Sequence, residues 1–284
     1  MNSRSYLQMA LALPMAGEGL CVLAQDGSSV LEPFSCTRDA RAIPYAHIRE
    51  ADAMWSKRVW RIIDLREKIN HPLFFPAEAG HGCPSLFEVV RNALLHEGGI
   101  TAYDPGPLRS DDSFSKPLES DAIRTLYGRV DTVWTEDLVT GELVPVPQVQ
   151  RLESRTVTRY QIKEDWVFDK QRSAMVIRIV GIAPMAEVRG PDGELRGHAP
   201  LFWLYYPECR PLFARWLSPS RWNDAERITF EEIFDKRIFS STIIKVSNVY
   251  DRRINEHLTG LDALLESERQ KQQLMEFEFD LWHH

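Results

Sequence analysis

Three carboxylates gather around a tryptophan in the segment KEDWVFDK, and they are the residues of this chain best suited to acid and base chemistry. Glu164, Asp165 and Asp169 surround Trp166. Two carboxylates near an indole can have their pKa values driven apart, so that one serves as acid and the other as base. The spacing does not require them to converge, and three basic residues stand beside them. Ion pairs at a surface or an interface are therefore the favoured interpretation.

Imidazole and thiolate groups that suit zinc occur at His71, His81 and Cys83. A structural zinc site needs a fourth ligand, and none stands at a recognisable spacing from these three. The chain also lacks a GxSxG motif, an HExxH motif and a glycine-rich loop that would cradle phosphate. The sequence therefore predicts no metal, no cofactor and no catalytic residue, and hence a protein that is not an enzyme.

The composition is that of a globular protein with a substantial core. The 284 residues are 44% hydrophobic and 26% charged, and the formal net charge is −7. An acidic chain has no general attraction for phosphate, which disfavours nucleic acid as a partner. After the first residues, no segment approaches the length of apolar sequence that crosses a bilayer, so no membrane span is predicted.

The first 24 residues have the features of an export signal. Arg4 precedes an apolar run at residues 7–16, and Val22-Leu23-Ala24 matches a signal-peptidase site. An unprocessed terminus is the alternative. Residues 25–45 have the composition of a flexible lead-in. Cleavage after residue 24 leaves Cys36, Cys83 and Cys209, of which at most one pair can form a disulfide; free buried thiols are the other interpretation.

Residues 46–76 predict a long amphipathic helix. Ile48, Trp55, Ile62 and Ile69 recur every seven residues, and charged residues fill the other positions. Further helices are predicted at residues 86–97, where Ser85 and Glu88 have capping-box spacing, at 121–127, and at 229–238. A hairpin is predicted at 130–147 and strands at 174–182, 199–206 and 241–246.

These elements together predict one α+β domain at residues 46–284, in which an antiparallel sheet packs with helices and a long helix at about 259–282 ends the chain. The run at 174–182 is apolar on both faces, as in a central strand, except for Arg178. Because an unpaired buried guanidinium is costly, a structural ion pair of Arg178 with Asp165 or Asp169 is predicted. Exposure of Arg178 at an imperfectly covered edge is the alternative.

The C-terminal helix is predicted to be acidic with a partial apolar stripe. Six carboxylates face only Arg269 and Lys271, and the stripe consists of Leu261, Leu264 or Leu265, Gln272, Met275 and Phe279. We expect the middle of the helix to be solvated. Near its end, exposure of Phe277, Phe279 and Trp282 would be costly, so we expect them to contact another subunit.

Tryptophan and arginine are enriched beyond what a core of this size needs, and these residue types dominate the centres of interfaces. Trp60 with Arg61 is the strongest interface candidate, because it lies off the heptad stripe of the predicted first helix. Core packing is the alternative for most of the tryptophans. The complete set predicted to bind a partner is Trp55, Trp60, Arg61, Trp166, Trp216, Trp222, Phe279 and Trp282.

Four separated blocks carry a family resemblance: WSKRVWRIIDLREKINHPLFFP at 55–76, IKEDWVFDKQRSAMVIRIVGIAP at 162–184, LFWLYYPECRP at 201–211 and TFEEIFDKRIFSSTIIKVSNVYDRRIN at 229–255. With the helical tail, they make the chain from about residue 45 onward resemble the GldN/PorN family of Bacteroidetes gliding motility and type IX secretion.

The resemblance implies a periplasmic structural protein that associates with a GldK/PorK-like outer-membrane lipoprotein in a large ring, without a cofactor or a reaction. It leaves open whether a GldM/PorM-like inner-membrane motor component is a second partner. The alternative from another class is a periplasmic hydrolase or lyase that uses the carboxylates of KEDWVFDK.

Overall fold

The computed structural model describes residues 35–76, 83–136, 143–190, 192–219 and 227–281. The chain divides into a unit of residues 1–35 and a compact unit of residues 36–284, and every helix and strand among the described residues belongs to the second unit. The predicted signal peptide at 1–24 lies outside the described residues, as do residues 25–34 of the predicted lead-in.

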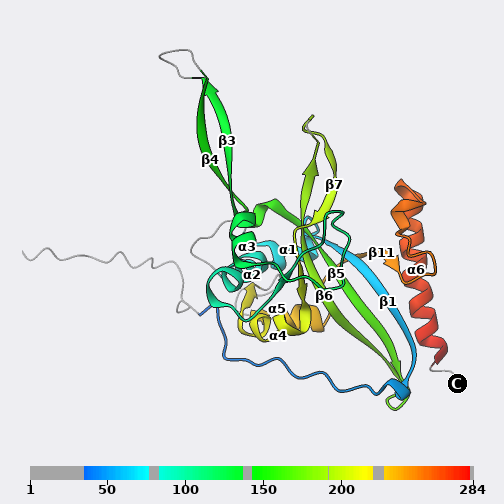
Figure 1. Ribbon diagram of the computed structural model, residues 1–284. Helices are drawn as coiled ribbons and strands as arrows, with labels where there is room; N and C mark the ends of the chain where they lie inside the picture. The colour runs from blue at the N-terminus through cyan, green and yellow to red at the C-terminus, as the bar shows by residue number, and fades with distance from the viewer. Residues whose placement is uncertain (1–34, 77–82, 137–142, 191, 220–226, 282–284) are drawn as a thin grey trace, which may run out of the picture. The chain divides into compact units, whose positions relative to one another are not determined.

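An antiparallel sheet of seven strands organises the compact unit (Figure 1). Six strands follow one another across the sheet, and the seventh, β7, pairs with β6 beside β8. This sheet, together with the helices below, confirms the predicted α+β class. In spatial order the strands are β11 (Thr242–Val246), β1 (Ala53–Asp64), β5 (Val157–Asp169), β6 (Ala174–Arg189), β8 (Trp203–Tyr205) and β2 (Ala102–Tyr103), with β7 (Leu195–Pro200) alongside.

The predicted helix at residues 46–76 is wrong, because its central part, residues 53–64, is the long strand β1. This strand pairs with β5 along its length and with β11 on its other side. Val59 and Ile63 are buried on one face of β1 and Trp60 on the other. A strand that is covered on both faces needs apolar residues at odd and at even positions. In this segment the resulting pattern contains a recurrence every seven residues, which imitates the repeat of an amphipathic helix. The β-branched and aromatic residues of the segment agree with a strand.

Helices cover one face of the sheet and enclose the main core with it. The α2 prediction is confirmed at its start, where the Ser85 hydroxyl accepts a hydrogen bond from the Glu88 N–H at 3.4 Å. The predicted cap of α5 is also confirmed, since Thr229 and Glu232 form both bonds of a capping box. The helices are α1 (His71–Phe74), α2 (Leu86–Asn92, continued by a π turn at Ala93–Glu97), α3 (Ser120–Tyr127), α4 (Tyr206–Arg215), α5 (Phe230–Asp235) and α6 (Gly260–Leu281).

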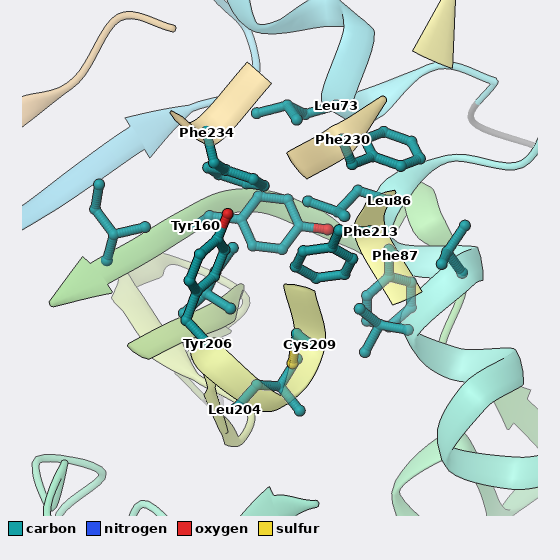
Figure 2. Packing of buried hydrophobic residues seen from close by; sticks show 14 of the residues in the cluster. Leu73, Leu86, Phe87, Tyr160, Leu204, Tyr206, Cys209, Phe213, Phe230 and Phe234 are labelled. Atoms are coloured by element: carbon teal, nitrogen blue, oxygen red, sulfur yellow. The ribbon is translucent and has the colours of Figure 1, made fainter. Parts of the chain in front are cut away.

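Aromatic rings fill this core (Figure 2). Tyr160 comes from β5, Tyr206 and Phe213 from α4, and Phe234 from α5, and each is at most 2% exposed. The Tyr206 ring lies 5.6 Å from that of Phe234 and 6.0 Å from that of Phe213, between centroids. Aromatic side chains bury large apolar areas, so they account for much of the driving force that holds the helices on the sheet.

Two small two-stranded sheets complete the fold. The predicted hairpin at 130–147 is confirmed as β3 (Gly128–Glu136) paired with β4 (Leu143–Arg151), although its tip lies outside the described residues. The second is β9 (Leu217–Pro219) with β10 (Arg227–Thr229). The long strand β5 and the helix α4 were not predicted, because their apolar residues follow neither a clean two-residue nor a clean helical period.

The loop at residues 104–117 lies on the sheet face that carries Trp60. Asp112 accepts hydrogen bonds from the Trp60 indole at 2.5 Å and from the Lys163 ammonium at 3.0 Å. Phe114 packs so close to Gly181 of β6 that a Cβ there would lie 2.4 Å from its ring. Glycine is therefore required at position 181 for this loop to seat on the sheet.

The segment before β1 runs without helix or strand over the described residues 38–49. A disulfide between Cys36 and Cys83 ties its start, which decides among the pairings left open by the sequence. Cys209 is a buried free thiol. Further on, Arg210 donates to the carbonyl of Ile43 at 2.7 Å and Arg178 donates to the carbonyl of Ala46. These contacts hold the segment against the domain.

Candidate interaction surface

The C-terminal helix α6 is fastened to the sheet by one face. The Ser267 hydroxyl accepts a hydrogen bond from the backbone N–H of Ile243 in the edge strand β11 at 3.0 Å. Leu274 is buried in a small core beneath the helix. Toward the end of the helix, the Phe277 ring stacks on Trp55 of β1 at 4.5 Å between centroids. The helix thus covers the β11 edge and protects it from pairing with another strand.

A second apolar face of α6 points away from these contacts. Each residue advances a helix by about 100°. Ser267 and Leu274, which face the sheet, therefore lie nearly opposite Phe279 around the helix axis. Five large apolar side chains remain exposed to solvent on α6: Leu261 (70%), Leu264 (56%), Leu265 (59%), Met275 (46%) and Phe279 (63%). Such a concentration on one helix marks a surface that is suited to a partner.

Four of these apolar residues, together with the polar Glu268 and Gln272 between them, follow a spacing of alternately four and three residues. We call the row the α6 seam: Leu261, Leu265, Glu268, Gln272, Met275 and Phe279. A mean spacing of 3.5 residues is the signature of a helix that packs along another helix. The seam is apolar at both ends and polar in the middle.

Both polar members of the seam are exposed and contact neighbours within α6. The Glu268 carboxylate lies 3.6 Å from the Lys271 ammonium, and the Gln272 amide donates to Glu276 at 2.7 Å. The flanks of the seam are acidic, because Asp262, Glu276 and Glu278 outnumber Arg269 and Lys271 there. The helix therefore presents an apolar row within a negative field.

Trp60, Arg61 and Trp166 are buried within the compact unit, whereas their predicted interface role expects them on its surface. Their side chains are at most 7% exposed. Lys245 stacks on the Trp60 ring at 4.4 Å, and Asp112 accepts its indole N–H. Burial lowers the pKa of the Arg61 guanidinium, which donates to the Ser241 hydroxyl at 2.9 Å. Intramolecular partners satisfy these side chains.

The other predicted interface residues lie in varied surroundings. Trp55 is half-buried under Phe277, and Trp216 is half-buried against the main core. Phe279 is exposed on the α6 seam. Trp222 and Trp282 lie outside the described residues. The exposed leucines of the seam were assigned to a partial stripe by the sequence, and only the packing of α6 shows that this stripe faces away from the sheet.

The predicted ion pair of Arg178 with Asp165 or Asp169 is not formed. Asp165 lies opposite Arg178 in the β5–β6 register, yet its carboxylate pairs with Arg58 of β1 at 2.6 Å. Asp169 instead lies 3.6 Å from Arg172. Arg178 donates to the Ala46 carbonyl and stacks on Tyr45 at 5.3 Å. A backbone carbonyl and an aromatic ring thus replace the expected carboxylate.

The carboxylates of KEDWVFDK do not converge on one site. They lie on β5, where neighbouring residues point to opposite faces, so Glu164 and Asp165 are on different sides of the sheet. Glu164 is fully buried and pairs with Arg237 at 2.8 Å, while the Trp166 indole donates to it at 3.1 Å. Asp165 and Asp169 share a face but stand about 13 Å apart along the strand. This arrangement gives no paired acid and base.

A disulfide removes one of the three candidate zinc ligands. Cys83 is in the disulfide with Cys36, and His81 lies outside the described residues. Within the described part of the chain, no cluster of three His, Cys, Asp or Glu side chains could hold a metal ion. Among the described helices, none is both long and apolar enough to span a membrane.

Comparison with known proteins gives one family. None of the curated proteins matches this chain as a relative. The family model described as "Gliding motility associated protein GldN" matches residues 48–283. This match includes β1, the whole seven-stranded sheet and α6 with its seam. Because the match spans most of the chain, the protein belongs to the GldN family of gliding-motility-associated proteins.

Proposed function

We propose that this protein is a structural component of the periplasmic ring of the type IX secretion and gliding-motility apparatus. In this role it binds a GldK/PorK-like outer-membrane lipoprotein and catalyses no reaction. The observation that carries the proposal is the family match over residues 48–283, which makes the chain a gliding-motility-associated protein. A GldM/PorM-like inner-membrane component is the second partner to be tested.

The disulfide supports a periplasmic location. Disulfides form and persist in oxidising compartments and are rare in the cytosol. The Cys36–Cys83 bond joins the segment before β1 to the residues that precede α2. An oxidising compartment outside the inner membrane suits such a bond, and the export signal predicted at residues 1–24 would deliver the chain there.

The surface of α6 supports an assembly role. Exposed apolar side chains of this size in one row are costly to leave in water, and a neighbouring chain that covers them removes that cost. In a ring, many repeated contacts add their effects, so each single contact need not be strong. Phe279 belongs to this surface. Trp55, which stacks on Phe277 of α6, and Trp216, at the main core, are half-buried and so remain partly accessible.

Size-exclusion chromatography with light scattering tests the proposal. The chain without residues 1–24 is run alone and after mixing with the lipid-free form of its lipoprotein. We expect the mixture to elute as a complex larger than one copy of each protein. Elution as two separate species would contradict the assembly role. Fractionation of cells should find the chain with periplasmic and outer-membrane markers; recovery with cytosolic markers would contradict the location.

A further inference from the structure

The α6 seam has the geometry of a helix-binding surface. Its positions alternate by four and three residues from Leu261 to Phe279, a length of about 27 Å along the helix axis. An extended strand would present side chains every second residue and would not match this spacing. A second helix presents knobs at the same 3.5-residue interval and can therefore fill the seam along its whole length.

A second copy of α6 fits this seam poorly. An antiparallel pairing that brings Leu261 against Phe279 also brings Asp262 against Glu276 and Arg269 against its own equivalent. A shift by one heptad matches Arg269 with Glu276 but sets the carboxylate of Glu268 against Phe279. A parallel pairing sets Glu268 against Glu268. Like charges at flanking positions and a carboxylate in an apolar contact are both unfavourable, so self-association is disfavoured in each arrangement.

Charge determines what does fit. Glu268 occupies a central seam position and is 67% exposed at its side chain, with the Lys271 ammonium of its own helix 3.6 Å away. Docking of any helix would remove this carboxylate and its Lys271 neighbour from water, which is costly, and a further cation on the partner reduces that cost. Asp262, Glu276 and Glu278 add negative charge along the flanks.

We infer that the α6 seam binds an amphipathic helix of a different protein, one that places Lys or Arg opposite Glu268 and along its flanks, with apolar residues against Leu261, Leu265, Met275 and Phe279. The inference rests on the proposed assembly role, because it assigns a class of partner to the surface through which the chain assembles. Electrostatic complementarity would set the register and exclude acidic helices.

Two synthetic helical peptides test this inference on the chain without residues 1–24. Both carry leucines in the four-three spacing over about three heptads; one has lysine at the flanking and central positions, and the other has glutamate there. Binding is followed by fluorescence anisotropy. The lysine peptide should bind, and the glutamate peptide should not.

Variants separate the seam from general attraction to an acidic protein. Glu268→Lys should weaken binding of the lysine peptide by about thirtyfold, and Leu265→Ser should weaken it without any change in charge. Glu194→Lys is the matched control, since it makes the same charge change at an exposed position in the turn before β7, outside α6, and should bind as the unmodified chain does. All three positions are exposed, and equal melting temperatures confirm an intact fold.

Three outcomes would overturn the inference. They are failure of both peptides to bind, equal binding of both peptides, and a dimer of the chain alone that Leu265→Ser converts to a monomer. The lipoprotein mixture is run with the same variants. If the unmodified chain forms no complex with the lipoprotein, the proposed function is contradicted, while the peptide result still stands. A complex that survives both seam variants removes α6 from that assembly and leaves the proposed function standing.

Discussion

The backbone N–H of Ile243 donates to the side-chain hydroxyl of Ser267 at 3.0 Å, and this bond joins the edge strand β11 to helix α6. Both residues are buried, with 2% and 3% of their surface exposed. An edge strand has backbone donors with no further strand to receive them. Here a serine on the packed face of the helix receives one of them, so the helix that displays the seam is held by the sheet itself.

Removal of this hydroxyl should destabilise the domain. Ser267→Ala leaves the buried N–H of Ile243 without its acceptor, which should lower the free energy of unfolding by about 1–3 kcal/mol. Denaturation in urea measures the change. Ser56→Ala, at an exposed position of β1, is the control and should leave stability nearly unchanged. Equal stabilities of the two variants would show that the bond contributes nothing.

Asp112 should be essential to the seating of the loop at 104–117. It pairs with Lys163, whose side chain is only 6% exposed, and it receives the Trp60 indole. Asp112→Ala leaves that ammonium buried without a carboxylate, so the free energy of unfolding should fall by about 3–5 kcal/mol. The neighbouring exposed Asp111→Ala is the control for loss of a carboxylate in the same loop. Guanidinium denaturation of both variants decides, and an unchanged midpoint for Asp112→Ala would refute the role.

Trp60 and Phe279 should behave in opposite ways. Trp60→Ala removes a buried ring and should cost about 3–5 kcal/mol of stability. Phe279→Ala removes an exposed ring and should leave the melting temperature unchanged while weakening complex formation with the lipoprotein. Thermal unfolding and size-exclusion chromatography measure the two effects. Normal stability of Trp60→Ala would contradict the structure, and undiminished assembly of Phe279→Ala would remove that residue from the interface.

The cysteines should differ in reactivity. Burial raises the pKa of the Cys209 thiol, so it should resist alkylation in the native protein and react only after unfolding. Cys36 and Cys83 should become reactive after mild reduction, and the double variant Cys36→Ser/Cys83→Ser should lose up to about 4 kcal/mol, given the 47-residue separation of the pair. Mass spectrometry of iodoacetamide adducts locates the reactive thiols. Labelling of Cys209 in the native chain would contradict its burial.

Stability should depend on pH through His198. Burial and then the nearby Arg159 lower the pKa of this imidazole below 6.5, and its Nδ1 lies 3.3 Å from an Arg159 donor, which requires the unprotonated nitrogen as acceptor. The unfolded chain therefore binds a proton more readily than the folded one. The contribution of the uncharged His198 to stability is complete above pH 6.5. It is lost as the pH falls through the lower pKa that this imidazole has in the folded chain.

Melting temperatures between about pH 7.5 and about pH 5 test this prediction. The unmodified chain should lose stability across that range, and His198→Gln should lose less. Glu187, whose pKa is lowered chiefly by its hydrogen bond from Arg189, has an ordinary value of 4.5 and therefore acts at lower pH. The same slope in both proteins would assign the effect to other groups.

Elements with local signals were predictable from the sequence. The Ser85 cap of α2 and the Thr229 capping box of α5 depend on residues three apart, so no distant contact is needed to form them. The strand β6 was evident from its continuous apolar run, and α6 from its strong helix formers. The family resemblance over the later chain agrees with the match at residues 48–283.

Long-range pairing determined the features that the sequence left undecided or misrepresented. Residues 53–64 form a strand because β5 and β11, far along the chain, pair with both of their edges. That same pairing buries Trp60 under the loop that carries Asp112 and so removes it from the surface. The partner of Cys36 was likewise settled only by the distance between two backbones.

The composition and periodicity of residues 260–281 by themselves determined that they form an acidic helix with a partial apolar stripe. Which face of that helix would be covered was decided by the tertiary structure, since Ser267, Leu274 and Phe277 are the residues that meet the sheet. The physical reason is that helical periodicity identifies the faces of a helix, whereas burial depends on the elements that pack against each face.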